Sequence, residues 1–153
     1  MEGWLLLVLV AVVLGALLGY RQFRSFGREI HYERAREAFK LQRERLEAHF
    51  LAAAAASGKP RGLRWVEVEW EREVTFARER HSRQLAALVG ATIRFEAVEG
   101  GDMEGLPAVG NLRNASAVFF FHRGQWHTVG KAIFNMNPGE AVEHFKNTYE
   151  RLE

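Results

Sequence analysis

The sequence predicts an α+β protein with an N-terminal transmembrane helix, an amphipathic helix, a four-stranded antiparallel curled sheet and a C-terminal helix. Three patterns lead to this prediction. An uncharged apolar run opens the chain, a helical period of three to four residues follows, and a strand period of two covers much of the rest. They divide the 153 residues into a membrane anchor (1–22), a juxtamembrane amphipathic helix (23–60) and a sheet domain (61–153).

The opening run carries an aromatic ring at each end, where interfacial aromatic residues prefer to lie. The residues before it lack the positive charge of a cleavable signal peptide, so we expect an anchor, with cleavage as the alternative. Arginines follow the run, and positive flanks stay in the cytoplasm. We therefore expect a single-pass membrane protein with a cytoplasmic C-terminal domain and membrane lipid as a partner. The residues expected at the membrane interface are Trp4, Tyr20, Arg21, Arg24 and Arg28.

The amphipathic helix is predicted by apolar residues at three- and four-residue steps, such as Phe39, Leu46 and Phe50. A glycine followed by a proline within 57–60 indicates where this helix ends. Because the apolar stripe is narrow, the helix needs a partner surface.

Two antiparallel hairpins are predicted next. In the first, apolar and acidic residues alternate from Val66 to Phe76, a polar turn follows at 79–83, and alternation resumes at 85–97. Gly90 or Arg72 marks a bulge or bend in it. The second hairpin joins 117–121 to 126–134 through Arg123-Gly124, after a glycine-rich connector at 99–114.

The final helix is predicted to begin at Asn137, which can cap it, with Pro138 at the first helical position and Glu140 reaching back. Its buried stripe is expected to run on to the end of the chain. That stripe contains Ala141, Val142, Phe145, Tyr149 and Leu152.

A long helix followed by strands that curl around it resembles the cystatin-like and NTF2-like superfold, and the stretch VFFFHRGQWHTVGKAIFN is similar to the last hairpin of NTF2-like proteins. The resemblance implies a concave sheet. Since that superfold hosts enzymes, ligand pockets and association domains, it implies no catalytic residue.

The composition excludes several classes of function. With 21 basic and 19 acidic residues, the net charge of +2 gives no field suited to a phosphate backbone, so we expect no nucleic-acid partner. The absence of cysteine excludes disulfides, thiolate nucleophiles and cysteine-bound metals. No metal or cofactor is predicted, and no catalytic motif is recognised.

Several residues remain candidates for ligand or partner binding. A two-residue turn at 123–124 places His122 and His127 on one side of the sheet, as the start of a metal or acid–base site or as solvent-facing histidines. The row Glu67, Glu69, Glu71 and Glu73 is either a charged docking stripe or a solvated face. Aromatic residues lie on both faces of the second hairpin, so each face is either covered or exposes a patch. The candidate residues are His122, His127, Trp126, Phe120 and Arg72.

The resulting hypothesis is a membrane-tethered, non-enzymatic interaction or scaffold module that binds a protein partner or a second copy of itself. The first alternative is a small-molecule pocket, catalytic or not, between the curled sheet and the helix at 29–56, with His122, His127 or Arg72 as polar contacts. The second is a pilin-like assembly subunit.

Overall fold

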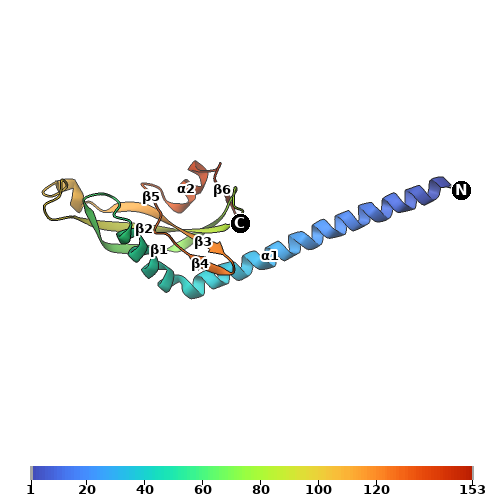
Figure 1. Ribbon diagram of the computed structural model, residues 1–153, viewed down its shortest axis with the longest axis horizontal. Coiled ribbons are helices and arrows are strands. Elements are labelled where there is room, and N and C mark those ends of the chain that lie inside the picture. The colour runs from blue at the N-terminus through green and yellow to red at the C-terminus, as the bar shows by residue number, and fades with distance from the viewer. Residues whose placement is uncertain (1, 153) are drawn as a thin grey trace. The chain divides into compact units, whose positions relative to one another are not determined.

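The computed structural model describes the backbone of residues 2–152, and within that range the side chains of all residues except 2, 5, 22–28 and 30. Within residues 2–152 the chain forms three helices and six strands (Figure 1). The helices are α1 (Glu2–Ala56), the short 3-10 helix η1 (Pro107–Gly110) and α2 (Pro138–His144). The strands are β1 (Leu63–Glu79), β2 (Leu85–Ala97), β3 (Arg113–His122), β4 (Gln125–His127), β5 (Ala132–Phe134) and β6 (Tyr149–Arg151).

The chain forms two compact units, Met1–Glu37 and Ala38–Glu153. The first unit is the N-terminal part of α1. In it, Trp4 and Tyr20 are 62% and 63% exposed, and Arg21 is also exposed. The side chains of Arg24 and Arg28, which we expected at a membrane interface, lie outside the described residues.

Among the residues described, no helix combines the length and the apolar character that crossing a membrane requires. The predicted transmembrane helix, and with it the predicted single-pass membrane localisation, is therefore wrong. The apolar run from Trp4 to Tyr20 is about 17 residues long, short of the roughly 20 that span a bilayer core. Charged residues then follow within the same helix.

The six strands form one antiparallel sheet in the order β4-β3-β2-β1-β6, and β5 pairs with β3. The α+β class and the first hairpin are as predicted, but the predicted count of four strands is wrong. The segment expected to be one strand at 126–134 is divided into β4 and β5. Between them the Thr128 hydroxyl donates to the Val118 carbonyl and accepts from the Gly130 amide, so the chain leaves the regular ladder there.

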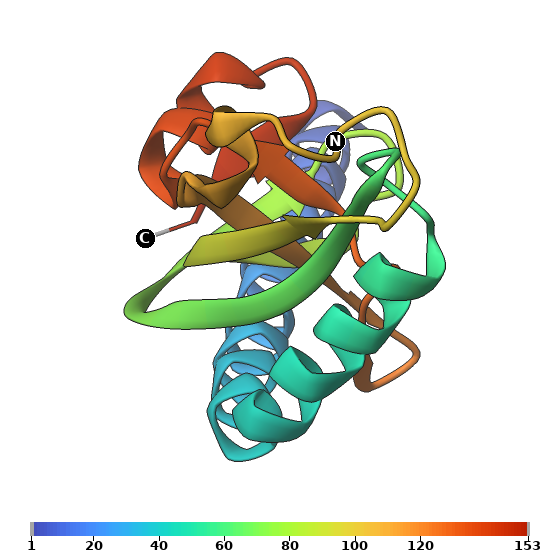
Figure 2. The same ribbon diagram turned by 90° about the vertical axis from the view of Figure 1, so that its left-hand side faces the viewer.

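The C-terminal part of α1, from Ala38, lies on one face of the sheet (Figure 2). It packs there through aromatic rings. Phe39 meets Phe119 and Trp126 at ring-centroid distances of 5.4 and 5.0 Å, and Phe50 meets Trp70 at 5.4 Å. Phe39, Phe50 and Phe119 are fully buried. Edge-to-face pairs of this kind add about 0.5–1.5 kcal/mol each to the free energy of burial. The space between helix and sheet is therefore filled by side chains.

On the opposite face of the sheet, α2 and the segment before it cover one part (Figure 2). Ala141 and Val142 of α2 pack with Leu88, Val118 and Tyr149. The predicted cap is confirmed, because the Asn137 side chain accepts from the Glu140 amide while the Glu140 carboxylate accepts from the Asn137 amide.

The predicted continuation of α2 to the end of the chain is wrong. The helix ends at His144, and the last residues form β6, which pairs with Ala77–Glu79 of β1. Pairing satisfies the backbone groups of β6 and still buries Tyr149.

Close contact between Gly130 and α1 gives a first test of the packing. Gly130 has φ of +73°, and an added Cβ would lie 2.3 Å from the backbone nitrogen of Ala54. Gly105 has a similar φ of +76° but open space around it. We expect Gly105→Ala to lower the free energy of unfolding by about 1–2 kcal/mol through backbone strain alone, and Gly130→Ala by about 1–3 kcal/mol more. Urea denaturation of both variants measures this, and equal losses would contradict the close approach.

The turn between β1 and β2 gives a second test. The pKa of Glu79 is lowered, mainly by the hydrogen bond from the Ser82 side chain, with the backbone N–H groups of Ser82 and His81 and the charge of His81 also contributing. A carboxyl whose folded pKa is depressed stabilises the fold above its unfolded pKa, and the contribution is lost as pH falls through the folded pKa. We expect Glu79→Gln to be destabilising at pH 7 and to have a smaller effect at about pH 3. The urea midpoints of the native chain and the variant at the two pH values test this expectation. If the midpoints differ by the same amount at both pH values, the lowered pKa of Glu79 does not contribute to stability.

Candidate functional site

A large bulge in β1 shapes the candidate site. Between the pairs Trp70–Ala91 and Val74–Val89, three residues of β1, at 71–73, stand opposite the single residue Gly90 of β2. This confirms the predicted bulge. A bulge bends its strand and redirects side chains, and bulges are common beside functional sites.

Arg43 of α1 holds the bulge from the helix side of the sheet. Its guanidinium donates to the carbonyl of Arg72 at 2.6 Å and also to the carbonyl of Glu71. Its Nε donates to the Glu47 carboxylate at 2.7 Å, which fixes the orientation of the guanidinium. Carbonyls that the sheet ladder leaves unpaired therefore receive charged donors.

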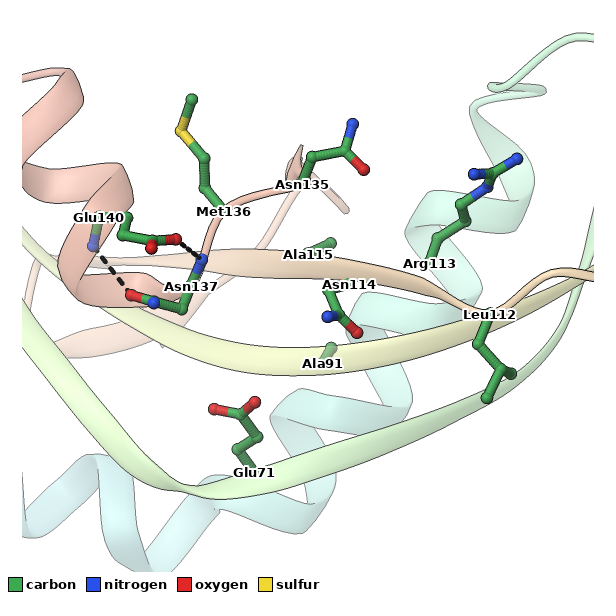
Figure 3. Close-up of a pocket in the computed structure, with 10 residues that line it drawn as sticks. All are labelled: Glu71, Ala91, Leu112, Arg113, Asn114, Ala115, Asn135, Met136, Asn137 and Glu140. Carbon is green, nitrogen blue, oxygen red and sulfur yellow. Dashed lines mark hydrogen bonds between the residues drawn. The ribbon is translucent and has the colours of Figure 1, made fainter.

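On the other face of the sheet, the Glu71 side chain lies directly over Gly90. A Cβ at Gly90 would lie 2.1 Å from Glu71 Oε2, so only glycine leaves room for this carboxylate. Glu71 forms one side of a groove of about 500 Å³. Figure 3 shows the carboxylate on the outermost strand drawn, with Asn114 beyond it and the start of α2 to one side. The lining residues are Glu71, Ala91, Leu112, Arg113, Asn114, Ala115, Asn135, Met136, Asn137 and Glu140.

The wall opposite Glu71 is formed by the segment that leads into α2. The reciprocal hydrogen bonds between Asn137 and Glu140 fix its start, as Figure 3 shows. The buried Ser116 hydroxyl donates to the Met136 carbonyl at 2.8 Å and ties the segment to β3. The groove wall is therefore held by the sheet and by a helix cap.

A second recess of about 430 Å³ continues from the groove, since Glu71 and Asn137 line both. Glu73, Thr75 and Arg151 complete it together with the first residues of α2. Glu71 and Glu73 of the acidic row thus border a continuous polar depression, which also carries Arg113 in the groove and Arg151 in the recess.

The four glutamates of the row differ in their partners. Glu67 pairs with Arg94 of β2 at 3.0 Å. Among the side chains that the structure describes, none forms an ion pair with Glu69, Glu71 or Glu73, all of which are exposed. Three solvated carboxylates therefore lie on one face of β1, and two of them, Glu71 and Glu73, line the depression.

The other predicted binding residues lie elsewhere. His122 and His127 do come together on the α2 side of the sheet, with ring centroids 6.3 Å apart, and both are exposed. His122 Nδ1 is 2.9 Å from Gln84 Nε2. Phe120 is partly buried against the cluster under α2, whereas Trp126 is 4% exposed within the α1-side core.

Arg72 lies exposed in the bulge. Neither the groove nor the recess is lined by Arg72, His122 or His127. In the described part of the chain, no three histidine, aspartate or glutamate side chains converge so as to hold a metal ion.

Sequence reasoning missed the groove-lining residues Asn114, Asn135 and Met136. Nothing in the local sequence points to them. The start of β3 and the segment before α2 are brought together only by the order of the strands in the sheet. Glu71 was identified as one of an acidic row, and Glu140 as a capping residue. That Glu71 and Glu140 line the same groove depends on the bulge in β1 and on where α2 packs on the sheet.

No protein-family model, curated protein or solved structure matches this chain. The resemblance to the cystatin-like and NTF2-like superfold therefore stays a prediction. Carboxylates, amide groups and the guanidinium groups of Arg113 and Arg151 line the site, an arrangement suited to binding charged and hydrogen-bonding groups.

Substitution tests whether Arg43 stabilises the bulge. We expect Arg43→Met to lower the free energy of unfolding by about 1.5–3 kcal/mol, since it leaves two carbonyls without charged donors. It should also speed amide hydrogen exchange at 71–73. Arg45→Met is the matched control, because Arg45 is exposed and its guanidinium reaches Gln42 on the same helix. Equal effects of the two variants would show that Arg43 does not hold the bulge.

Proposed function

We propose that this chain is a non-enzymatic interaction module whose acidic sheet face binds a basic segment of a partner protein. The observation that carries the proposal is a group of three exposed carboxylates without an ion pair among the described side chains. Glu71 and Glu73 line the polar groove and its recess, and Glu69 lies beside them on the same face of β1. Charge complementarity of this kind selects partners and speeds association.

The filled interior supports docking over an internal ligand pocket. Phe39, Phe50 and Phe119 occupy the space between α1 and the sheet and are fully buried. The two histidines of the alternative hypothesis lie on the opposite face and are exposed. A pocket between helix and sheet therefore has little room for a ligand.

The shape of the groove supports a protein segment as the ligand. Its carboxylates stand beside the amide groups of Asn114 and Asn135, which can hydrogen-bond to polar side chains of a bound segment. Its floor is the sheet itself. A lysine- or arginine-bearing segment thus places its charged side chains along β1, next to the groove.

The proposal predicts that charge on this face controls peptide affinity. The test uses the full chain and a fluorescent nine-residue peptide of alternating lysine and valine, measured by fluorescence anisotropy at low salt. We expect the triple variant Glu69→Gln, Glu71→Gln and Glu73→Gln to bind at least about tenfold more weakly. Three exposed pairs at about 0.5 kcal/mol each give that factor.

The matched control is the triple variant Glu44→Gln, Glu99→Gln and Glu143→Gln. It changes the net charge by the same amount at three exposed positions away from the groove. Its affinity should stay within about twofold of the native value. If both triple variants weaken binding equally, or if the native chain binds no basic peptide, the proposed function is wrong.

A further inference from the structure

The outer edge of β1 is open along most of its length. On its inner side, β1 pairs with β2 from Leu63 to Arg78. On its outer side, β6 pairs with β1 over Ala77–Glu79, and the Leu152 amide donates to the Phe76 carbonyl. Within residues 2–152, no strand pairs with the outer edge from Arg64 to Thr75. Figure 3 shows β1 as the outermost strand beside the groove.

Two irregularities bracket the accessible part of this edge. One register shift lies at Trp65–Glu67 and the other is the bulge at 71–73. Between them, Glu67–Trp70 follow the regular antiparallel register with β2. An open edge of this kind presents unpaired N–H and C=O groups that can take up one more strand.

The side chains along this edge alternate in character. Glu67 and Glu69 are exposed on the groove side, whereas Val68 and Trp70 are half-buried on the α1 side. In an antiparallel or parallel pair, neighbouring residues point to the same face of the sheet. An added strand would therefore need cationic residues on the groove side and apolar residues on the α1 side.

We propose that the basic partner segment binds as an added β-strand on the outer edge of β1, with alternating cationic and apolar residues. This inference rests on the proposed function and specifies how the segment is held. Backbone hydrogen bonds to Glu67–Trp70 supply affinity. Glu67 already pairs with Arg94, so the cationic side chains are selected by Glu69 and, beyond it, by Glu71 and Glu73.

The same residues disfavour a second copy of the chain at this edge. If two β1 edges paired antiparallel with their acidic rows on one face, Glu69 would face Glu69 or Glu67 would face Glu69 of the other copy. Like charges directly opposite each other are destabilising. The edge thus repels its own copy and accepts a basic strand, which is how edge charges give specificity.

The test distinguishes backbone pairing from charge attraction alone. Two versions of the lysine–valine peptide carry backbone N-methyl groups, one on every lysine and the other on every valine. An added strand turns alternate N–H groups toward β1, so one version should lose affinity at least about tenfold while the other stays within about threefold of the parent peptide. Amide hydrogen exchange at 67–70 should slow when the parent peptide binds.

Other results would overturn the inference in recognisable ways. If both methylated peptides bind as well as the parent, or both bind equally poorly, strand addition is wrong while charge-dependent docking survives. If amide exchange at 67–70 slows with protein concentration in the absence of peptide, the edge takes a second copy. If no version of the peptide binds, the proposed function fails together with the inference.

Discussion

The contact of Phe39 and Phe50 with the aromatic face of the sheet is the interaction on which the rest of the second unit depends. The two residues lie eleven positions apart on α1, three turns of helix, and so meet the sheet at two points. Phe39 reaches Phe76, Phe119 and Trp126, and Phe50 reaches the tryptophans of β1. Helix register relative to the strands is thereby fixed.

That register places Arg43 under the bulge of β1. Arg43 lies between the two phenylalanines, one turn after Phe39, and its guanidinium meets the carbonyls of Glu71 and Arg72. The bulge in turn leaves the Glu71 carboxylate over Gly90 on the far face. A contact on the α1 side of the sheet thus shapes the acidic groove on the α2 side, through a short chain of packed and hydrogen-bonded groups.

The two faces of the sheet have different roles in this arrangement. The α1 face is a closed aromatic core, and α2 covers the other face only in part. The uncovered part is polar and acidic, and it borders the open edge of β1. The residues that line the groove are carried by strands and by a capped helix start, so the surface that we propose for docking is held rigidly.

Periodicity and turn chemistry in the sequence by themselves determined the α+β class, the first hairpin, the bulge near Gly90, the end of α1 and the cap at Asn137. Each depends on residues close in the chain. Tertiary structure alone decided that the expected last strand splits at Thr128–Gly130, that the last residues pair with β1 instead of extending α2, and that Glu71 shares a groove with Asn114 and Glu140. Those outcomes depend on which backbone groups find partners from distant segments, and local sequence does not encode that choice.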